Sequence, residues 1–117
     1  LPRLSPLSDA AAPIEERVRS YWDSNCSMCH GAVGSIRATW DARYSTPLDG
    51  QGVLFGNLSG EAELPAGSFV AVPNDLEHSA LWQRARSNEP ALRMPPLGRR
   101  RVDTEYVRLL EQWLASL

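Results

Sequence analysis

The chain has 117 residues, of which 43% are hydrophobic and 22% are charged, a balance typical of one small globular domain. Its formal net charge of −2 gives no general reason to bind nucleic acid or anionic lipid, and no apolar run approaches the roughly 20 residues of a membrane-spanning helix. A domain of this size has a thin core, and many such domains recruit a metal, a disulfide or a cofactor. We therefore expect one core with a bound group added to it.

The first residues predict an extended linker or tail. Residues 1–12 contain prolines and small side chains without helical or strand periodicity. The chain begins at Leu1 with no initiator Met and no signal pattern, which indicates either a module of a longer protein or a mature protein with a loose tail. The domain itself is predicted over residues 13–117.

Two amphipathic helices are predicted near the ends of the domain, and their apolar faces should pack together. Pro13 suits a first helical turn and precedes apolar positions at helical spacing, namely Ile14, Val18, Tyr21, Trp22 and Cys26. Asp103 can cap a second helix whose apolar positions are Tyr106, Val107, Leu110, Trp113, Leu114 and Leu117.

The chain between these helices is predicted to be mostly loop, because glycine and proline recur between Gly31 and Pro73. Within it, Val53–Phe55 and Ser68–Val72 could pair as a short hairpin. Asn74 and Glu77 form a capping pair for a short third helix over Leu81, Trp82 and Ala85. So long a loop in a small domain needs something to wrap around, which again favours a cofactor.

Cys26, Cys29 and His30 form the pattern Cys-x-x-Cys-His, which is typical of covalent attachment of a c-type haem. Two thiols at this spacing can each add to one vinyl group on the same edge of the porphyrin, and the following imidazole can reach the iron. Both cysteines of the chain are used here. We therefore predict one covalent haem c, attached at Cys26 and Cys29, with His30 as an iron ligand.

Three other uses of these residues compete with haem attachment. A thioredoxin-like redox pair follows a strand in a βαβ unit, whereas a helix is predicted before Cys26. Structural zinc needs four ligands, and His30 is badly placed to share a tetrahedral ion with Cys29. A plain disulfide is the third alternative, and it leaves His30 without a role.

Haem iron takes a second axial ligand, for which Met94 is the candidate. Pro95 and Pro96 follow it and hold the backbone extended, which presents the thioether stiffly. Met28 lies inside the attachment loop and is tied to the other side of the haem. The alternatives are a core gap-filling role for Met94 and ligation by His78, for which an exposed position is expected.

The four tryptophans fall into two groups. Trp22, Trp82 and Trp113 lie on apolar helix faces and are predicted to be core. Trp40 lies in the loop between Arg37 and Arg43. Its indole N–H, or one of these two arginines, could bind a haem propionate, and ordinary packing is the alternative for Trp40.

Together these features resemble the class I cytochrome c fold over residues 14–117. The resemblance rests on Trp22 four residues before Cys26, the motif Cys-x-x-Cys-His-Gly, the looping middle, Met94-Pro95 and the aromatic C-terminal helix. It implies a mainly α fold with three or more helices around the haem. It further implies haem held by the two cysteines, iron ligated by His30 and Met94, and Trp22 packed near Leu110 and Trp113.

A narrower resemblance links the chain to cytochrome c domains of multimodular bacterial secreted proteins, through the segments Asn25–Gly31, Arg37–Tyr44, Thr46–Leu48, Val72–Asp75 and Arg93–Gly98. The expected function is then electron transfer rather than enzymatic catalysis, with a redox partner protein such as a secreted carbohydrate-active oxidase. The alternative is a haem enzyme or gas sensor with an open sixth position. Covalent haem predicts export to the periplasm or cell exterior, as a monomeric domain tethered in a larger protein. The basic cluster Arg93, Arg99, Arg100 and Arg101 is expected to steer the partner.

Overall fold

The computed structural model describes residues 4–27, 29–31, 40–58, 64–89, 92, 94 and 102–117. The described residues form three α-helices, α1 (Ile14–Asn25), α2 (Ala80–Arg86) and α3 (Thr104–Ala115), and a 3-10 turn, η1 (Leu48–Gly50). The predicted mainly α class is confirmed. Among the described residues, no helix has both the length and the apolar character needed to cross a bilayer.

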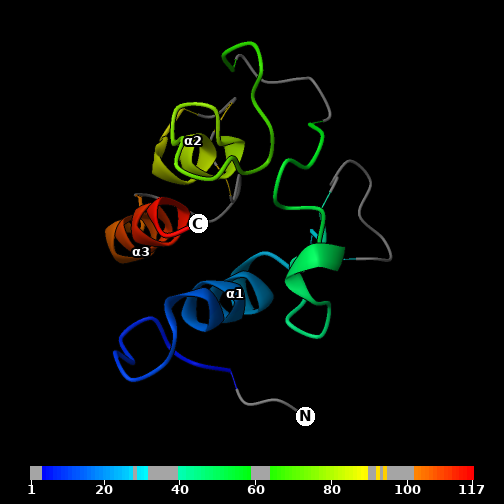
Figure 1. Ribbon diagram of the computed structural model, residues 1–117. Coiled ribbons are helices and arrows are strands. Elements are labelled where there is room, and N and C mark those ends of the chain that lie inside the picture. The colour runs from blue at the N-terminus through cyan, green and yellow to red at the C-terminus, as the bar shows by residue number, and fades with distance from the viewer. Residues whose placement is uncertain are drawn as a thin grey trace.

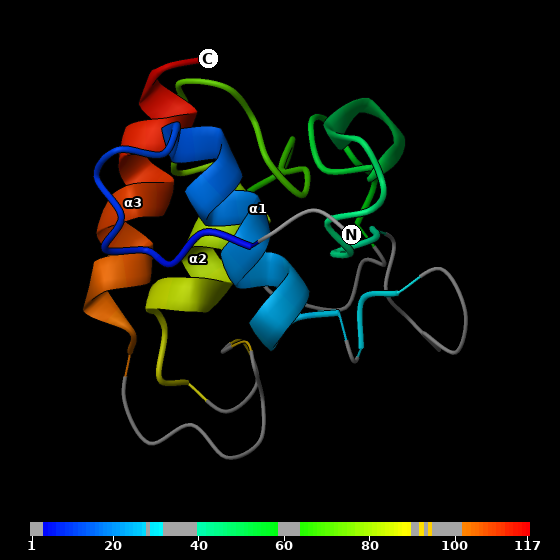
Figure 2. The same cartoon turned by 90° about the horizontal axis from the view of Figure 1, so that it is seen from below.

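The two terminal helices form as predicted and pack against each other. α1 begins directly after Pro13, and Asp103 caps α3 by accepting a hydrogen bond from the backbone N–H of Tyr106 (3.2 Å). Helix α3 contacts both α1 and α2, so it connects the other two helices of the described fold. Figures 1 and 2 show α3 beside both of them.

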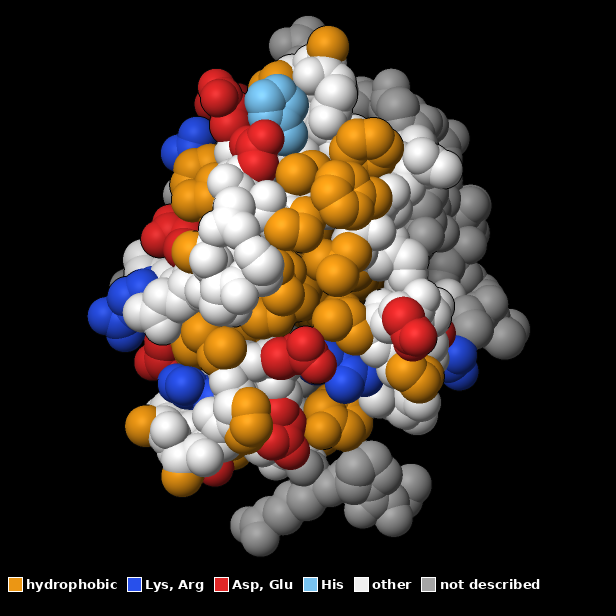
Figure 3. All heavy atoms as spheres, viewed as in Figure 1, with side chains coloured by type: hydrophobic (Ala, Val, Ile, Leu, Met, Phe, Trp, Pro, Cys, Tyr) orange, Lys and Arg blue, Asp and Glu red, His pale blue; other side chains and the backbone are white. Residues whose placement is uncertain are grey.

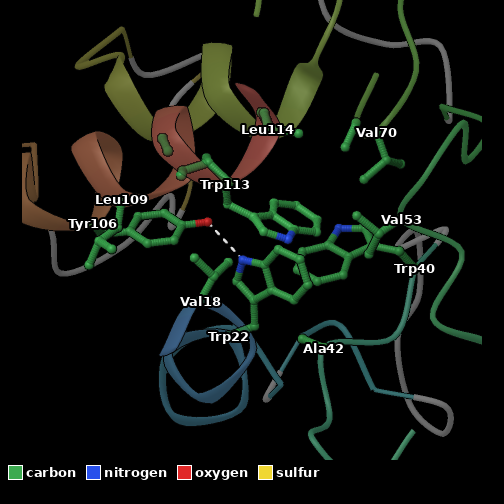
Figure 4. Close-up of a cluster of buried hydrophobic side chains, with 13 residues drawn as sticks. Val18, Trp22, Trp40, Ala42, Val53, Val70, Tyr106, Leu109, Trp113 and Leu114 are labelled. Atoms are coloured by element: carbon green, nitrogen blue, oxygen red, sulfur yellow. Dashed lines mark hydrogen bonds between the residues drawn. The ribbon is translucent and has the colours of Figure 1, made fainter. Parts of the chain in front are cut away.

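The core between α1 and α3 is aromatic, as Figure 4 shows. Trp22 and Trp113 are buried and meet edge to face, with ring centroids 5.4 Å apart. The indole N–H of Trp22 donates a hydrogen bond of 2.9 Å to the hydroxyl of Tyr106, which satisfies a buried donor inside the core. The expected packing of Trp22 against the last helix is therefore confirmed.

The predicted cap of the short third helix is wrong, although the helix exists. α2 starts at Ala80, with Ser79 rather than Asn74 at its N-cap position. Asn74 instead adopts a left-handed φ of 60° and fastens the end of α3. Its backbone N–H donates to the carbonyl of Leu114 (2.9 Å), and its side-chain amide donates to the carbonyl of Leu117.

The predicted hairpin is also wrong, but its two segments do meet. Leu54 and Ala71 form an isolated parallel bridge, whereas a hairpin would be antiparallel. The first segment ends at once because Phe55 has a φ of 54° and Gly56 turns tightly, where a Cβ would lie 1.8 Å from the carbonyl oxygen of Gly52. The chain thus leaves the bridge before a ladder can form.

Residues 4–12, predicted to be a linker or tail, lie against α1. The backbone N–H of Ser5 donates to the hydroxyl of Ser20 (3.0 Å), and the guanidinium of Arg17 donates to the carbonyl of Leu7 (3.0 Å from Nε). The side chain of Leu7 packs against the core. The place of the domain boundary stays a prediction.

The core does not cover itself completely. Several hydrophobic side chains that pack against it stay partly exposed, among them Leu48, Leu54, Leu76 and Leu81. Figure 3 shows apolar side chains gathered across the middle of one face, with charged groups mostly toward its edges. This is the expected condition of a chain too short to bury all its apolar surface.

The Trp22–Tyr106 hydrogen bond gives a stability prediction. Tyr106→Phe should lower the free energy of unfolding by about 1–3 kcal/mol, because it leaves the buried Trp22 N–H without an acceptor. Tyr21→Phe is the matched control, since its hydroxyl bonds Asp103 at the surface (2.9 Å), and it should cost less than about 1 kcal/mol. Denaturant unfolding measures both, and equal losses would contradict the buried bond's role.

Candidate haem site

The cysteine motif is held by hydrogen bonds at the end of α1. The N–H of Cys26 donates to the carbonyl of Trp22 (2.7 Å), and the N–H of His30 donates to the carbonyl of Cys26 (2.8 Å). The motif therefore begins at the last turn of α1 and closes in a tight turn of its own. Because Trp22 is locked in the core, the position of Cys26 relative to the core is fixed.

The two cysteines lack the properties of a thioredoxin-like pair. Both are free thiols, with Cys26 half-buried and Cys29 exposed. Burial, and secondarily the proximity of Cys29, raises the pKa of Cys26 to about 12, whereas a redox-active thiol needs a lowered pKa. Across the described parts of the chain, no three His, Cys, Asp or Glu side chains gather to hold a metal ion. Thioether attachment at these two cysteines stays a prediction.

His30 turns its ring into the aromatic core. The ring stacks on Trp40 with centroids 4.6 Å apart, and Trp40 meets Trp22 edge-on at 5.2 Å. Its Nδ1 is buried and has no hydrogen-bond partner. Burial and the positive charge of Arg84 lower the pKa of His30, which the backbone of Trp40 partly offsets. A neutral imidazole with an unpartnered ring nitrogen fits a metal-ligating role.

Of the residues proposed to bind the haem propionates, Trp40 and Arg43 lie in the described part of the structure. Trp40 is 9% exposed and packs in the core, as the ordinary-packing alternative expects. The guanidinium of Arg43 pairs with Asp41 (Nη2–Oδ2 2.9 Å), and Thr46 donates to the same carboxylate (2.7 Å). A role for Trp40 or Arg43 with a propionate stays a prediction. Outside the described residues lie Arg37, Met28 and the basic cluster Arg93, Arg99, Arg100 and Arg101.

Met94 is held against α2. Its backbone N–H donates to the carbonyl of Arg84 (3.1 Å), while Nη1 of Arg84 donates to the carbonyl of Leu92 (3.1 Å). Met94 is 36% exposed and lies outside the buried core, so it does not serve as a core gap-filler. In Figure 2, α1 and α2 both end toward the lower side of the view, and these ends lead to the two candidate ligand segments.

His78, the rival iron ligand, is partly exposed. Its Nδ1 lies 2.8 Å from a carboxylate oxygen of Asp75, and its side chain is 34% exposed. A partly exposed position agrees with the surface site expected for this histidine.

Comparison with known proteins gives a match over the segment that contains Met94. Residues 53–98 match a family model described as Planctomycete cytochrome C. The match supports a c-type cytochrome domain. It covers the segment that contains α2 and Met94 and lies outside the cysteine motif, so the two signals are independent. The family supports a haem-based electron-transfer role, with which the mainly helical fold is compatible. No curated protein and no solved structure shows a significant match.

The sequence analysis did not single out Arg84 as part of the candidate site. It stands in the last turn of α2 beside Arg86 and carries no motif, so the sequence gives no reason to prefer one arginine over the other. The distinguishing feature is tertiary, because only the folded chain brings Leu92 and Met94 back to Arg84.

The Asp41 cluster gives a pH prediction. Its hydrogen bond from Arg43 lowers the pKa of Asp41 from 3.8 to about 2. A depressed carboxyl pKa stabilises the fold above the unfolded value and ceases to do so as the pH falls through the folded value. The parent should therefore lose up to about 1 kcal/mol more than Asp41→Asn between pH 4 and pH 2, since the exposed guanidinium is screened.

Thermal unfolding at a series of pH values measures this difference. Asp49→Asn, the same change on η1, is the control and should follow the parent's profile. Parallel pH profiles for the parent and Asp41→Asn would contradict the assignment.

Proposed function

We propose that this domain is an electron-transfer module that binds one haem c covalently through Cys26 and Cys29 and ligates its iron with His30 and Met94. The observation that carries the proposal is the cysteine motif held at the end of α1, combined with a cytochrome family match over a separate segment that includes Met94. The haem, when bound, supplies a one-electron redox centre.

The chain's own residues would position and shield this centre. The core holds His30 against Trp40, which keeps water from one face of the imidazole. The backbone of Met94 is fixed on α2, and its side chain is 36% exposed. A thioether ligand favours the reduced iron relative to two nitrogen ligands, so a comparatively high reduction potential follows.

The proposal also includes a redox partner and a location in the cell. A redox partner protein needs only brief contact, which electrostatic steering provides, and Arg93, Arg99, Arg100 and Arg101 would supply the steering charge. The resemblance to domains of multimodular secreted proteins supports a partner such as a carbohydrate-active oxidase. Covalent haem supports export to the periplasm or cell exterior, with the domain a monomer tethered in a larger protein.

A haem enzyme or sensor would need an open iron and a distal acid or base. The described residues support electron transfer over this alternative through Met94. Its backbone is anchored on α2, where its thioether could close the sixth position.

Replacing the proposed ligand tests the function. In the haem-loaded domain, Met94→Ala should abolish the far-red absorption of a methionine–iron bond, lower the midpoint potential, and let cyanide bind faster. Met28→Ala, which removes the chain's other methionine, should change none of these. An unchanged spectrum and potential in Met94→Ala would transfer the role to another residue.

A further inference from the structure

The end of α2 is closed by the segment that carries Met94. The last carbonyls of any α-helix lack partners within the helix. In α2, the carbonyl of Arg84 accepts a hydrogen bond from the N–H of Met94 (3.1 Å). The proposed iron ligand therefore belongs to the residue whose backbone completes the helix.

The side chain of Arg84 makes a second attachment to the same segment. Its Nη1 donates to the carbonyl of Leu92 at 3.1 Å. Between the helix and this point the chain turns back, since the N–H of Glu89 donates to the hydroxyl of Ser87 (3.0 Å) and the N–H of Leu92 donates to the carbonyl of Glu89 (2.9 Å). One residue thus binds the segment at two points, Leu92 and Met94.

We propose that Arg84 is a positioning residue for the Met94 ligand, which it holds in place through the Leu92 carbonyl. This inference rests on the proposed function, because it requires a haem ligated by His30 and Met94.

The neighbouring Arg86 provides a matched control. It occupies the same last turn of α2, but its guanidinium lies over the ring of Trp82, 4.5 Å from the centroid. A change of Arg86 to Gln removes the same charge and side chain from the same helix without touching the Leu92 contact.

The experiment uses the haem-loaded domain and compares Arg84→Gln, Arg84→Lys and Arg86→Gln with the parent. Imidazole is the probe, because it must displace Met94 to bind the ferric iron. Arg84→Gln should bind imidazole about five-fold more tightly, the effect of one lost hydrogen bond. Arg84→Lys should restore only part of the resistance to imidazole, because a lysine keeps a donor but not the planar fork. Arg86→Gln should bind imidazole as the parent does.

Two results separate failure of this inference from failure of the proposed function. If the parent shows the methionine–iron absorption and Arg84→Gln matches it in imidazole affinity, the role of Arg84 is overturned while the function stands. If the parent lacks that absorption and binds imidazole as Met94→Ala does, ligation by Met94 fails. Should Arg84→Gln not hold haem, Arg84→Lys decides by itself, and an imidazole affinity equal to the parent's overturns the inference.

Discussion

The packing of Trp22 against α3 is the interaction on which the rest of the described structure depends. Trp22 is fully buried, meets Trp113 edge to face, and donates its indole N–H to Tyr106. A large side chain held by both shape and a buried hydrogen bond fixes the rotation and height of its helix. Because Cys26 follows one turn later, this contact determines where the cysteine motif stands relative to the core.

Helix α3 carries that constraint to the second half of the site. It contacts α1, which leads into His30, and α2, whose end binds Met94. The separation of the two proposed iron ligands is thus set by how two helices pack on a third, and Arg84 binds the Leu92 carbonyl beside Met94. With haem bound, such an arrangement would hold both proposed ligands in place, which would suit electron transfer because little reorganisation would be needed.

The sequence predicted well where the signal was local and failed where it was tertiary. Helical periodicity and single capping residues located α1 and α3. The spacing of Cys26, Cys29 and His30 predicts haem attachment whatever the fold around it. Asn74 looked like a helix cap because its spacing to Glu77 suited one, but the end of α3 lies within reach and takes its hydrogen bonds. The hairpin prediction failed because the sequences of two short segments do not reveal whether the segments pair in parallel or antiparallel. Arg84 could not be singled out from the sequence, since its contacts with Leu92 and Met94 form only in the folded chain.

Covalent haem attachment can be tested by the mass of the mature domain. The chain, expressed together with haem maturation machinery, should carry one haem that survives acid–acetone extraction. Peptide mapping should place this haem on the fragment that contains both Cys26 and Cys29, with no free thiol left. A chain of unmodified mass with two reactive thiols, or a haem that leaves with the solvent, would contradict the account.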